Sequence, residues 1–259
     1  MRKYDRDDRP FMTSYPAARG IVYGAILAIL LTGAPAQAAE IAQTLARCQD
    51  QTVQPKQRLA ACAALIDDKA LEPNMRVEAL LNRGLVREAA GDTIGALEDY
   101  TAAADLDGDN ELAYFNSGNV YEALGQYEDA IRHYDRAIAL NGNDADFFNN
   151  RGRAWDSLGN VEKAMADFTS ALKIDPKHAS AHVNRALALT DQGEHTKAMV
   201  DFDKAIALGV DEADVWAARG GVNETLGRSE SAQQDFAKAI ALNPSHERAL
   251  EGQARVQSK

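Results

Sequence analysis

The feature that most constrains the fold of this chain is a period of 34 residues. Gly84, Gly118 and Gly152 are separated by 34 residues each, and Gly220 follows 68 residues after Gly152. Boundaries placed seven residues before these positions divide the sequence, without insertion or deletion, into units 77–110, 111–144, 145–178, 179–212 and 213–246. Such a period is typical of solenoids, in which each unit stacks on its neighbours to bury its apolar face.

Small and aromatic residues fall in fixed columns when the five units are aligned by position. Position 15 is always glycine, position 20 is always alanine, and position 24 is tyrosine or phenylalanine. Positions 4, 8 and 11 share one face of a helix, and positions 20, 24 and 27 share one face of a second helix. Glycine at position 15 ends the first helix and permits a left-handed backbone in the turn. Each unit is therefore predicted to be a helical hairpin.

This pattern resembles the tetratricopeptide repeat family over residues 77–246. The resemblance implies an all-α, right-handed superhelix of five helix–turn–helix repeats, in which the first helices line a concave groove that holds peptides or partner proteins. Residues 247–259 continue the pattern as one capping helix, whereas His182 and Ala186 in the fourth unit depart from it. The unit closest to the family pattern contains Tyr114, Gly118, Tyr121, Gly125, Tyr127, Ala130, Tyr134 and Ala137.

Residues 1–38 have the three parts of a secretory signal peptide. Basic residues precede an apolar run at 21–32, and small residues ending at Ala38 follow it. The run is shorter than the ~20 residues that span a bilayer. We therefore expect cleavage after Ala38 and a periplasmic or secreted protein. The alternatives are a buried helix or an uncleaved inner-membrane anchor at 21–32, and translation can start at Met1 or Met12.

Residues 39–76 break the period and are predicted to form a capping hairpin of helices 41–49 and 57–66. Cys48 and Cys62 fall one on each helix. In an oxidising compartment they can form a disulfide, which is worth ~3 kcal/mol in the chain-entropy model. Two buried free thiols are the alternative, and no base partner supports a catalytic thiol. The hairpin is similar to one that precedes the repeats in exported proteins of Gram-negative bacteria.

Positions 7 and 23 vary together. Arginine at position 7 is always accompanied by aspartate at position 23, and the unit with Ser117 at position 7 has His133 at position 23. Co-variation of this kind indicates contact, and a bidentate pair would hold the two helices of a hairpin in register. The expected structural ion pairs are Arg83–Asp99, Arg151–Asp167, Arg185–Asp201 and Arg219–Asp235.

The candidate binding residues lie on the face of each first helix that points away from its buried side. Position 6 is asparagine in four units, and asparagine can both donate to and accept from a peptide backbone. The alternative is that these asparagines cap or bridge neighbouring hairpins. Acidic residues at positions 12 and 13 favour a basic or neutral partner. The candidate peptide-binding residues are Asn82, Asn116, Asn119, Asn149, Asn150, Arg153 and Asn184.

Charge and motifs disfavour several classes of function. The formal net charge of −11 argues against nucleic-acid binding. The segment that begins at Asp105 resembles a calcium loop but has Asn110 where glycine is required. His178 and His182 have metal-ligand spacing without a third ligand, so we expect no metal and no cofactor.

No catalytic motif is present, and the repeats leave little sequence for a catalytic domain. We therefore expect a non-enzymatic scaffold that binds a protein or peptide. The alternative is a structural subunit of an envelope assembly that uses its convex face or helix ends. The sequence fixes neither the partner nor the oligomeric state.

Overall fold

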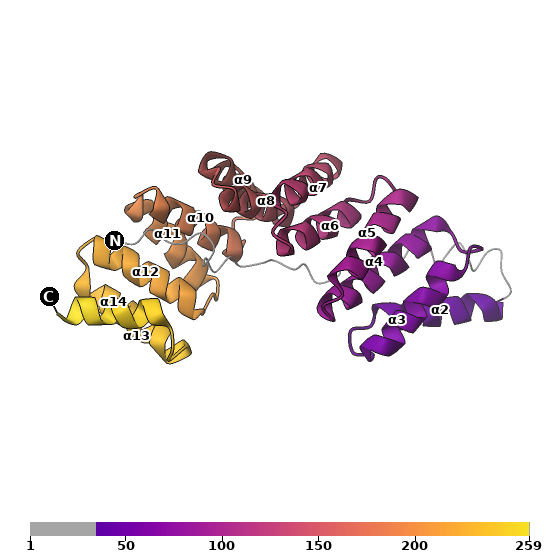
Figure 1. The fold of residues 1–259 in the computed structure, drawn as a ribbon, viewed down its shortest axis with the longest axis horizontal. Coiled ribbons are helices and arrows are strands. Elements are labelled where there is room, and N and C mark those ends of the chain that lie inside the picture. Colours follow the sequence, from indigo (N-terminus) through magenta and orange to yellow (C-terminus); the bar gives the residue numbers. More distant parts are fainter. Residues whose placement is uncertain (1–34, 259) are drawn as a thin grey trace. The chain divides into compact units, whose positions relative to one another are not determined.

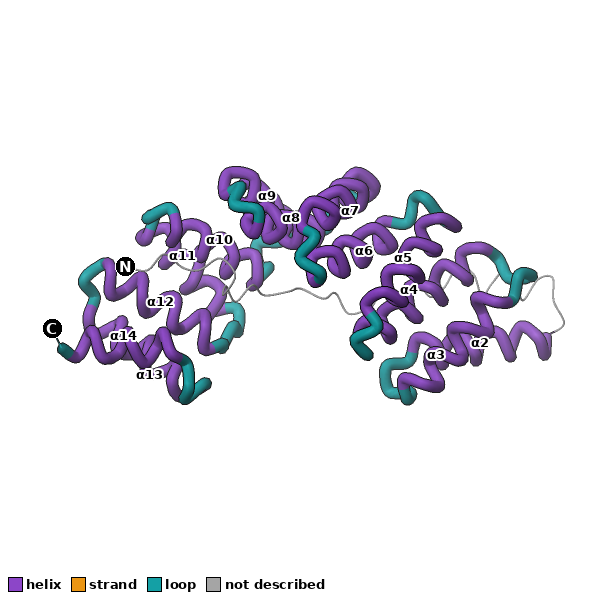
Figure 2. The backbone as a smooth tube through the Cα atoms, in the orientation of Figure 1, coloured by secondary structure: helices purple, strands orange, loops and turns teal. Residues whose placement is uncertain are grey.

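A computed structural model describes residues 35–258. Helices joined by short turns account for this range, and no strand occurs in it (Figures 1 and 2). The helices are α2 (Pro35–Gln49), α3 (Pro55–Asp67), α4 (Pro73–Ala89), α5 (Thr93–Leu106), α6 (Glu111–Ala123), α7 (Tyr127–Leu140), α8 (Ala145–Ser157), α9 (Val161–Ile174), α10 (Ala179–Asp191), α11 (His195–Ala207), α12 (Ala213–Thr225), α13 (Ser229–Leu242) and α14 (Glu247–Gln257).

The described chain divides between Gly142 and Asn143 into two compact units. In the first unit, α2 packs on α3, α4 on α5 and α6 on α7, and the successive hairpins pack through α3 with α4 and α5 with α6. In the second unit the hairpins are α8 with α9, α10 with α11 and α12 with α13, and α14 packs on α13 and α12. The expected all-α fold of stacked helical hairpins is confirmed within each unit.

Glycine at position 15 has the conformation that the sequence predicts. Gly91, Gly125, Gly159, Gly193 and Gly227 have φ values of 80°, 71°, 79°, 77° and 74°. A β-carbon is strained in this left-handed region, whereas glycine adopts it readily. Each hairpin can therefore reverse the chain between its two helices within a few residues.

The small residue at position 8 makes room for the aromatic ring at position 24 of the same hairpin. A β-carbon added to Gly118 would lie 2.6 Å from the ring of Tyr134, and one added to Gly152 would lie 2.7 Å from the ring of Phe168. Both rings are fully buried. The close approach of the two helices thus depends on the absence of a side chain at position 8.

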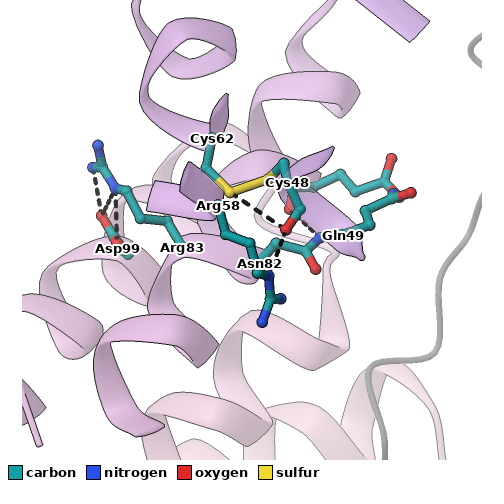
Figure 3. Close-up of a disulfide and its surroundings, with 8 residues drawn as sticks. Cys48, Gln49, Arg58, Cys62, Asn82, Arg83 and Asp99 are labelled. Carbon is teal, nitrogen blue, oxygen red and sulfur yellow. Dashed lines mark hydrogen bonds and ion pairs between the residues drawn. A yellow bond between two sulfur atoms is a disulfide. The ribbon is translucent and has the colours of Figure 1, made fainter. Parts of the chain in front are cut away.

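A disulfide joins α2 to α3 in the N-terminal cap (Figure 3). The Cα atoms of Cys48 and Cys62 are 4.9 Å apart, and both side chains are fully buried. Leu45, Leu65 and Met75 pack around them in one apolar cluster. The expected disulfide is confirmed, and the alternative of two free thiols is excluded.

The cap helices begin earlier than the sequence predicts. The observed α2 starts at Pro35 rather than at residue 41, so its first turn contains the expected cleavage position at Ala38. None of the helices within residues 35–258 combines the length and the apolar character that crossing a membrane requires. The apolar run 21–32 lies outside the described residues, and its role as a leader or an anchor stays a prediction.

Candidate functional site

All four expected arginine–aspartate contacts occur in the structure. The shortest nitrogen–oxygen distances are 2.6 Å in the first unit of the period and 2.7, 2.7 and 2.5 Å in the third, fourth and fifth units. Each guanidinium donates from both Nε and Nη2, and each aspartate is buried. These contacts hold the two helices of a hairpin together and engage the four arginines.

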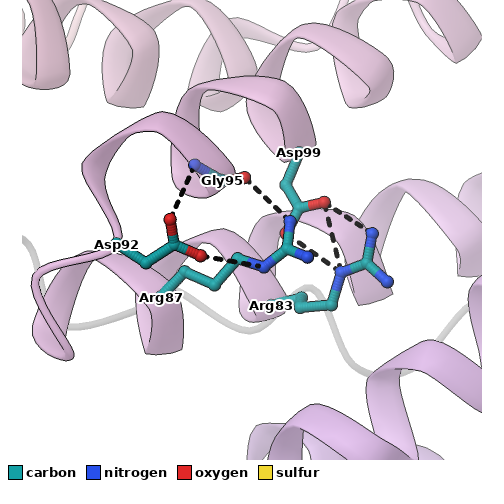
Figure 4. Close-up of polar contacts among 5 residues, drawn as sticks. All are labelled: Arg83, Arg87, Asp92, Gly95 and Asp99. Carbon is teal, nitrogen blue, oxygen red and sulfur yellow. Dashed lines mark hydrogen bonds and ion pairs between the residues drawn. The ribbon is translucent and has the colours of Figure 1, made fainter.

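The first repeat adds a second arginine to this arrangement (Figure 4). Nη1 of Arg87 lies 3.0 Å from Oδ2 of Asp99 and donates to the carbonyl oxygen of Gly95 at 2.9 Å. Asp92 accepts from the backbone N–H of Gly95 and caps α5. Two guanidinium groups therefore neutralise one buried carboxylate in this hairpin.

The second repeat replaces the ion pair with aromatic contacts. Oγ of Ser117 donates to a backbone oxygen of its own helix at 2.8 Å. The ring of His133 lies 4.9 Å from that of Tyr121 and 6.2 Å from that of Tyr114, measured between centroids. Burial and, secondarily, the charge of Arg132 lower the pKa of His133, which favours a neutral ring between the two tyrosines.

Three of the candidate groove asparagines form an amide chain in the second unit. Nδ2 of Asn184 donates to Oδ1 of Asn149 at 2.9 Å, and Nδ2 of Asn149 donates to Oδ1 of Asn150 at 3.1 Å. Their side chains are at most 2% exposed, and Arg153 on the same helix is 7% exposed. This arrangement, which links α10 to α8, is the bridging alternative that the sequence left open.

The candidate asparagines of the first unit bond within their own repeats. Nδ2 of Asn82 donates to the backbone oxygen of Glu78 at 2.8 Å, and Oδ1 of Asn119 accepts from the hydroxyl of Tyr134 at 2.8 Å. Both asparagines are buried. Asn116 is the candidate groove residue whose side chain stays partly exposed.

Two half-buried carboxyl groups lie on the groove face of α4. The first, Glu78 at position 2, accepts a hydrogen bond from Nε2 of Gln49 in the cap, and burial raises its pKa to about 7 although that bond opposes the rise. The second, Glu88 at position 12, accepts from the hydroxyl of Tyr100 at 3.0 Å. Burial raises the pKa of Glu88 too, against the effect of its hydrogen bond.

Neither carboxyl group is paired with a cation within residues 35–258, because both printed partners are neutral. Sequence reasoning placed Glu88 on an acidic edge but missed Glu78. The environment of Glu78 depends on Gln49, which lies in the cap and outside the repeat pattern.

A tyrosine–glutamate pair recurs in the first two repeats. The hydroxyl of Tyr134 donates to Glu122 at 2.9 Å, as that of Tyr100 does to Glu88. Position 24 is tyrosine only in these two units, and both have glutamate at position 12. This co-variation is a sequence signal for the contact, analogous to that of positions 7 and 23.

Histidines at position 34 cap a helix and reach back to the preceding repeat. Nδ1 of His178 accepts from the backbone N–H of Ala181 at 3.2 Å, and its Nε2 lies 3.0 Å from Oδ1 of Asp146. The same distances join His246 to Ala249 and Asp214. These two units are the ones with aspartate at position 2, so a further co-variation marks the contact.

His182 is also engaged in structural contacts. Its Nδ1 lies 2.7 Å from Oδ1 of Asp201, and its Nε2 lies 3.1 Å from the backbone oxygen of Pro176. Among residues 35–258 no group of three histidine, cysteine, aspartate or glutamate side chains could hold a metal ion.

These observations define a class of protein: a repeat protein of stacked helical hairpins whose polar groups serve mainly to join helices. Two models described as tetratricopeptide repeat match the chain, one at residues 115–179 and 166–214 and the other at 213–246. Together the matches extend over residues 115–246, about half of the sequence. The chain belongs to the tetratricopeptide repeat family. No curated protein matches it.

Solved structures of repeat proteins share this fold. PilF of Pseudomonas aeruginosa has a TM-score of 0.73 and 18% identity, and the match covers 85% of this chain and 97% of PilF. YrrB, described as a TPR protein with an unusual peptide-binding site, has a TM-score of 0.60 and 21% identity over 76% of this chain and 99% of YrrB. MamA has a TM-score of 0.56 and 22% identity over 65% of this chain and 92% of MamA. At these identities the likeness concerns the fold.

Proposed function

We propose that this protein is a non-enzymatic scaffold that holds a basic, extended segment of a partner protein on the groove face of its first unit. Membership of the tetratricopeptide repeat family supports a protein-interaction role, and the related fold of YrrB includes a peptide-binding site. The specific observation behind the proposal is the pair of half-buried carboxyl groups on α4, Glu78 and Glu88, which hydrogen-bond only to neutral groups in the described chain.

The physical argument rests on the cost of burying charge. An ionised carboxylate loses hydration when it is buried, and a nearby cation lowers that cost. The raised pKa of Glu78, about 7, shows that the folded chain itself does not provide such a cation. A lysine or arginine from a partner would provide it, and the partly exposed Asn116 could bond the partner's backbone. An acidic segment would increase the cost instead.

Isothermal titration of the purified protein with synthetic peptides tests this proposal. A 12-residue peptide with alternating lysine and alanine is the probe, and its glutamate–alanine counterpart is the control. We expect the basic peptide alone to bind. Below pH 7 its binding should release protons from Glu78, which is measured by titration in buffers of different ionisation enthalpy.

Matched substitutions locate the binding site. Glu78→Gln and Glu88→Gln should each weaken binding of the basic peptide about tenfold or more, whereas exposed Glu230→Gln on α13 should leave it unchanged. Equal affinity for basic and acidic peptides, or no effect of the α4 substitutions, would refute the proposal.

The alternative function is a structural subunit of an envelope assembly. Burial of Asn149, Asn150 and Asn184 favours it, because these amides bond one another rather than facing a ligand. Asn116→Ala separates the two functions. Weaker peptide binding by a stably folded variant supports the scaffold, and unchanged binding supports the structural subunit.

The proposed compartment is the periplasm. The leader-like composition of residues 1–38 supports export. The disulfide between Cys48 and Cys62 also supports it, since such bonds persist mainly in oxidising compartments. Mass spectrometry of the protein from fractionated cells should find an N-terminus near Ala39 and no free thiol. Full-length protein with two free thiols in the cytoplasm would exclude export.

A further inference from the structure

The last helix repeats the packing pattern of a first helix but has no second helix on it within the described chain. In α14, Leu250 occupies position 4 and Ala254 occupies position 8. The opposite side of α14 is used, because Gly252 and Ala249 pack in the core of the fifth repeat with Phe236. Figure 1 shows α14 beside α12 and α13 in the second unit.

Exposure sets this helix apart from its counterparts. Leu250 is 44% exposed, whereas Leu80 at the same position of the first repeat is 3% exposed and His182 is 8% exposed. The three other residues at position 4 are half-buried, and Ala254 is exposed although the corresponding Ala186 is fully buried. The leucine and alanine therefore form a small apolar strip where the earlier repeats have a covered one.

The repeats show what covers such a strip. In each hairpin a second helix places an aromatic ring on position 8, as Phe236 does on Gly220, where an added β-carbon would lie 2.8 Å from the ring. Alanines at positions 20 and 27 flank that ring on the second helix. The strip on α14 continues an interface that the chain builds repeatedly, so it fits a helix with a bulky apolar residue between two small ones.

Charge argues against a second copy of the chain as the occupant. An antiparallel pair that sets Leu250 over Ala254 of the other copy has its two-fold axis level with residue 252. Glu251 of each copy would then face the other, and it is exposed. The nearest base, Arg255, already bonds Glu224 at 3.0 Å. A partner with lysine or arginine facing Glu247 and Glu251 removes the repulsion.

We propose that the exposed face of α14 docks an amphipathic helix of a partner protein, with a bulky apolar residue over Ala254 and basic residues beside Glu247 and Glu251. The surface is separate from the groove face of the first unit. It would let one scaffold hold two partners, one as an extended segment and one as a helix.

Fluorescence anisotropy with the whole purified protein tests the docking. The probe is a labelled, lactam-stapled peptide with the sequence of Val161–Ile174, which carries Phe168 between two alanines and two lysines. We expect binding with a Kd below about 1 mM. Leu250→Asp should weaken it at least about tenfold, because it removes one buried leucine contact. A peptide with Phe168→Asp should fail to bind.

A matched control and a second readout keep the test decisive. Val200→Asp changes another exposed aliphatic residue, 67% exposed on α11, and should bind the probe as the parent does. Circular dichroism checks that each variant is folded. Absence of probe binding, or equal binding by Leu250→Asp and the parent, would overturn the proposal.

Photo-crosslinking in the producing cells identifies the occupant. With p-benzoylphenylalanine at position 250, we expect a cross-linked tryptic peptide from another protein that forms a helix with the stated apolar and basic residues. A cross-link to α14 of a second copy, together with a dimer in sedimentation equilibrium that Leu250→Asp abolishes, would show self-association instead and would overturn the assignment of the partner.

Discussion

Asn184 donates a hydrogen bond of 2.9 Å to Asn149, which lies in the preceding repeat, 35 residues earlier in the chain. Both side chains are fully buried, so this amide bond is part of the packing between α10 and α8. Replacement of Asn184 by alanine should lower the free energy of unfolding by ~2 kcal/mol, because it leaves Oδ1 of Asn149 buried without its donor. Urea denaturation followed by circular dichroism measures the loss.

Asn116 provides the matched control for that prediction. It occupies the same position of its repeat but is partly exposed, so Asn116→Ala should change the free energy of unfolding by less than about 0.5 kcal/mol. Equal losses in the two variants would mean that burial does not separate bridging from solvent-facing asparagines.

The arginine–aspartate pairs should be costly to break singly and cheap to remove together. Arg151→Leu leaves the carboxylate of Asp167 buried without its charge partner and should cost ~3 kcal/mol. Adding Asp167→Leu should recover most of that loss, because the buried charge is then gone. A double-mutant cycle in urea measures the coupling, and strictly additive losses would contradict it.

The two helical glycines Gly252 and Gly221 should respond to alanine in opposite directions. A β-carbon on Gly252 would collide with the ring of Phe236, so Gly252→Ala should cost ~1–3 kcal/mol and displace α14. A β-carbon on Gly221 meets no atom within 4 Å, so Gly221→Ala should stabilise the protein by ~0.5–1 kcal/mol. Thermal melts of both variants check the two signs.

The stability of the first unit should depend on the ionisation of Glu78. Its pKa is about 7 in the folded protein against 4.5 for the unreacted side chain, so folding favours the protonated form. The contribution of that protonation is fully present below pH 4.5 and is lost as the pH rises to about 7. Glu78→Gln should therefore stabilise the protein by about 1 kcal/mol at pH 8, allowing for screening by solvent, and by little at pH 4. A constant difference across this range would contradict the assignment.

Reduction of the disulfide should weaken the N-terminal cap. In the chain-entropy model the loop between Cys48 and Cys62 is worth ~3 kcal/mol. With dithiothreitol, hydrogen exchange should become faster in α2 and α3 while α10 to α13 keep their protection. Equal acceleration in both units would show that the cap supports the whole chain.

Sequence reasoning anticipated the hairpins and the arginine–aspartate contacts, because each depends on residues at fixed places in a repeat. The covariation of Ser117 with His133 marked even the exception. It did not anticipate the burial of Asn149 and Asn184, since periodicity identifies a helix face but not how closely the next repeat covers it. The half-buried environment of Glu78 was also missed, because it depends on Gln49, which lies outside the repeat pattern.

The disulfide has a consequence for how the protein would respond to a reducing environment. It joins α2 only to α3, whereas the hold of this pair on α4 comes from the apolar cluster around Met75, from Gln49 on Glu78 and from Arg76 on the backbone of Ile66. Stacked repeats lose order from an unprotected edge inward. Breaking one sulfur–sulfur bond would thus act as a local release that frays the N-terminal edge and leaves the distant repeats folded, so the protein could register redox conditions at one end only.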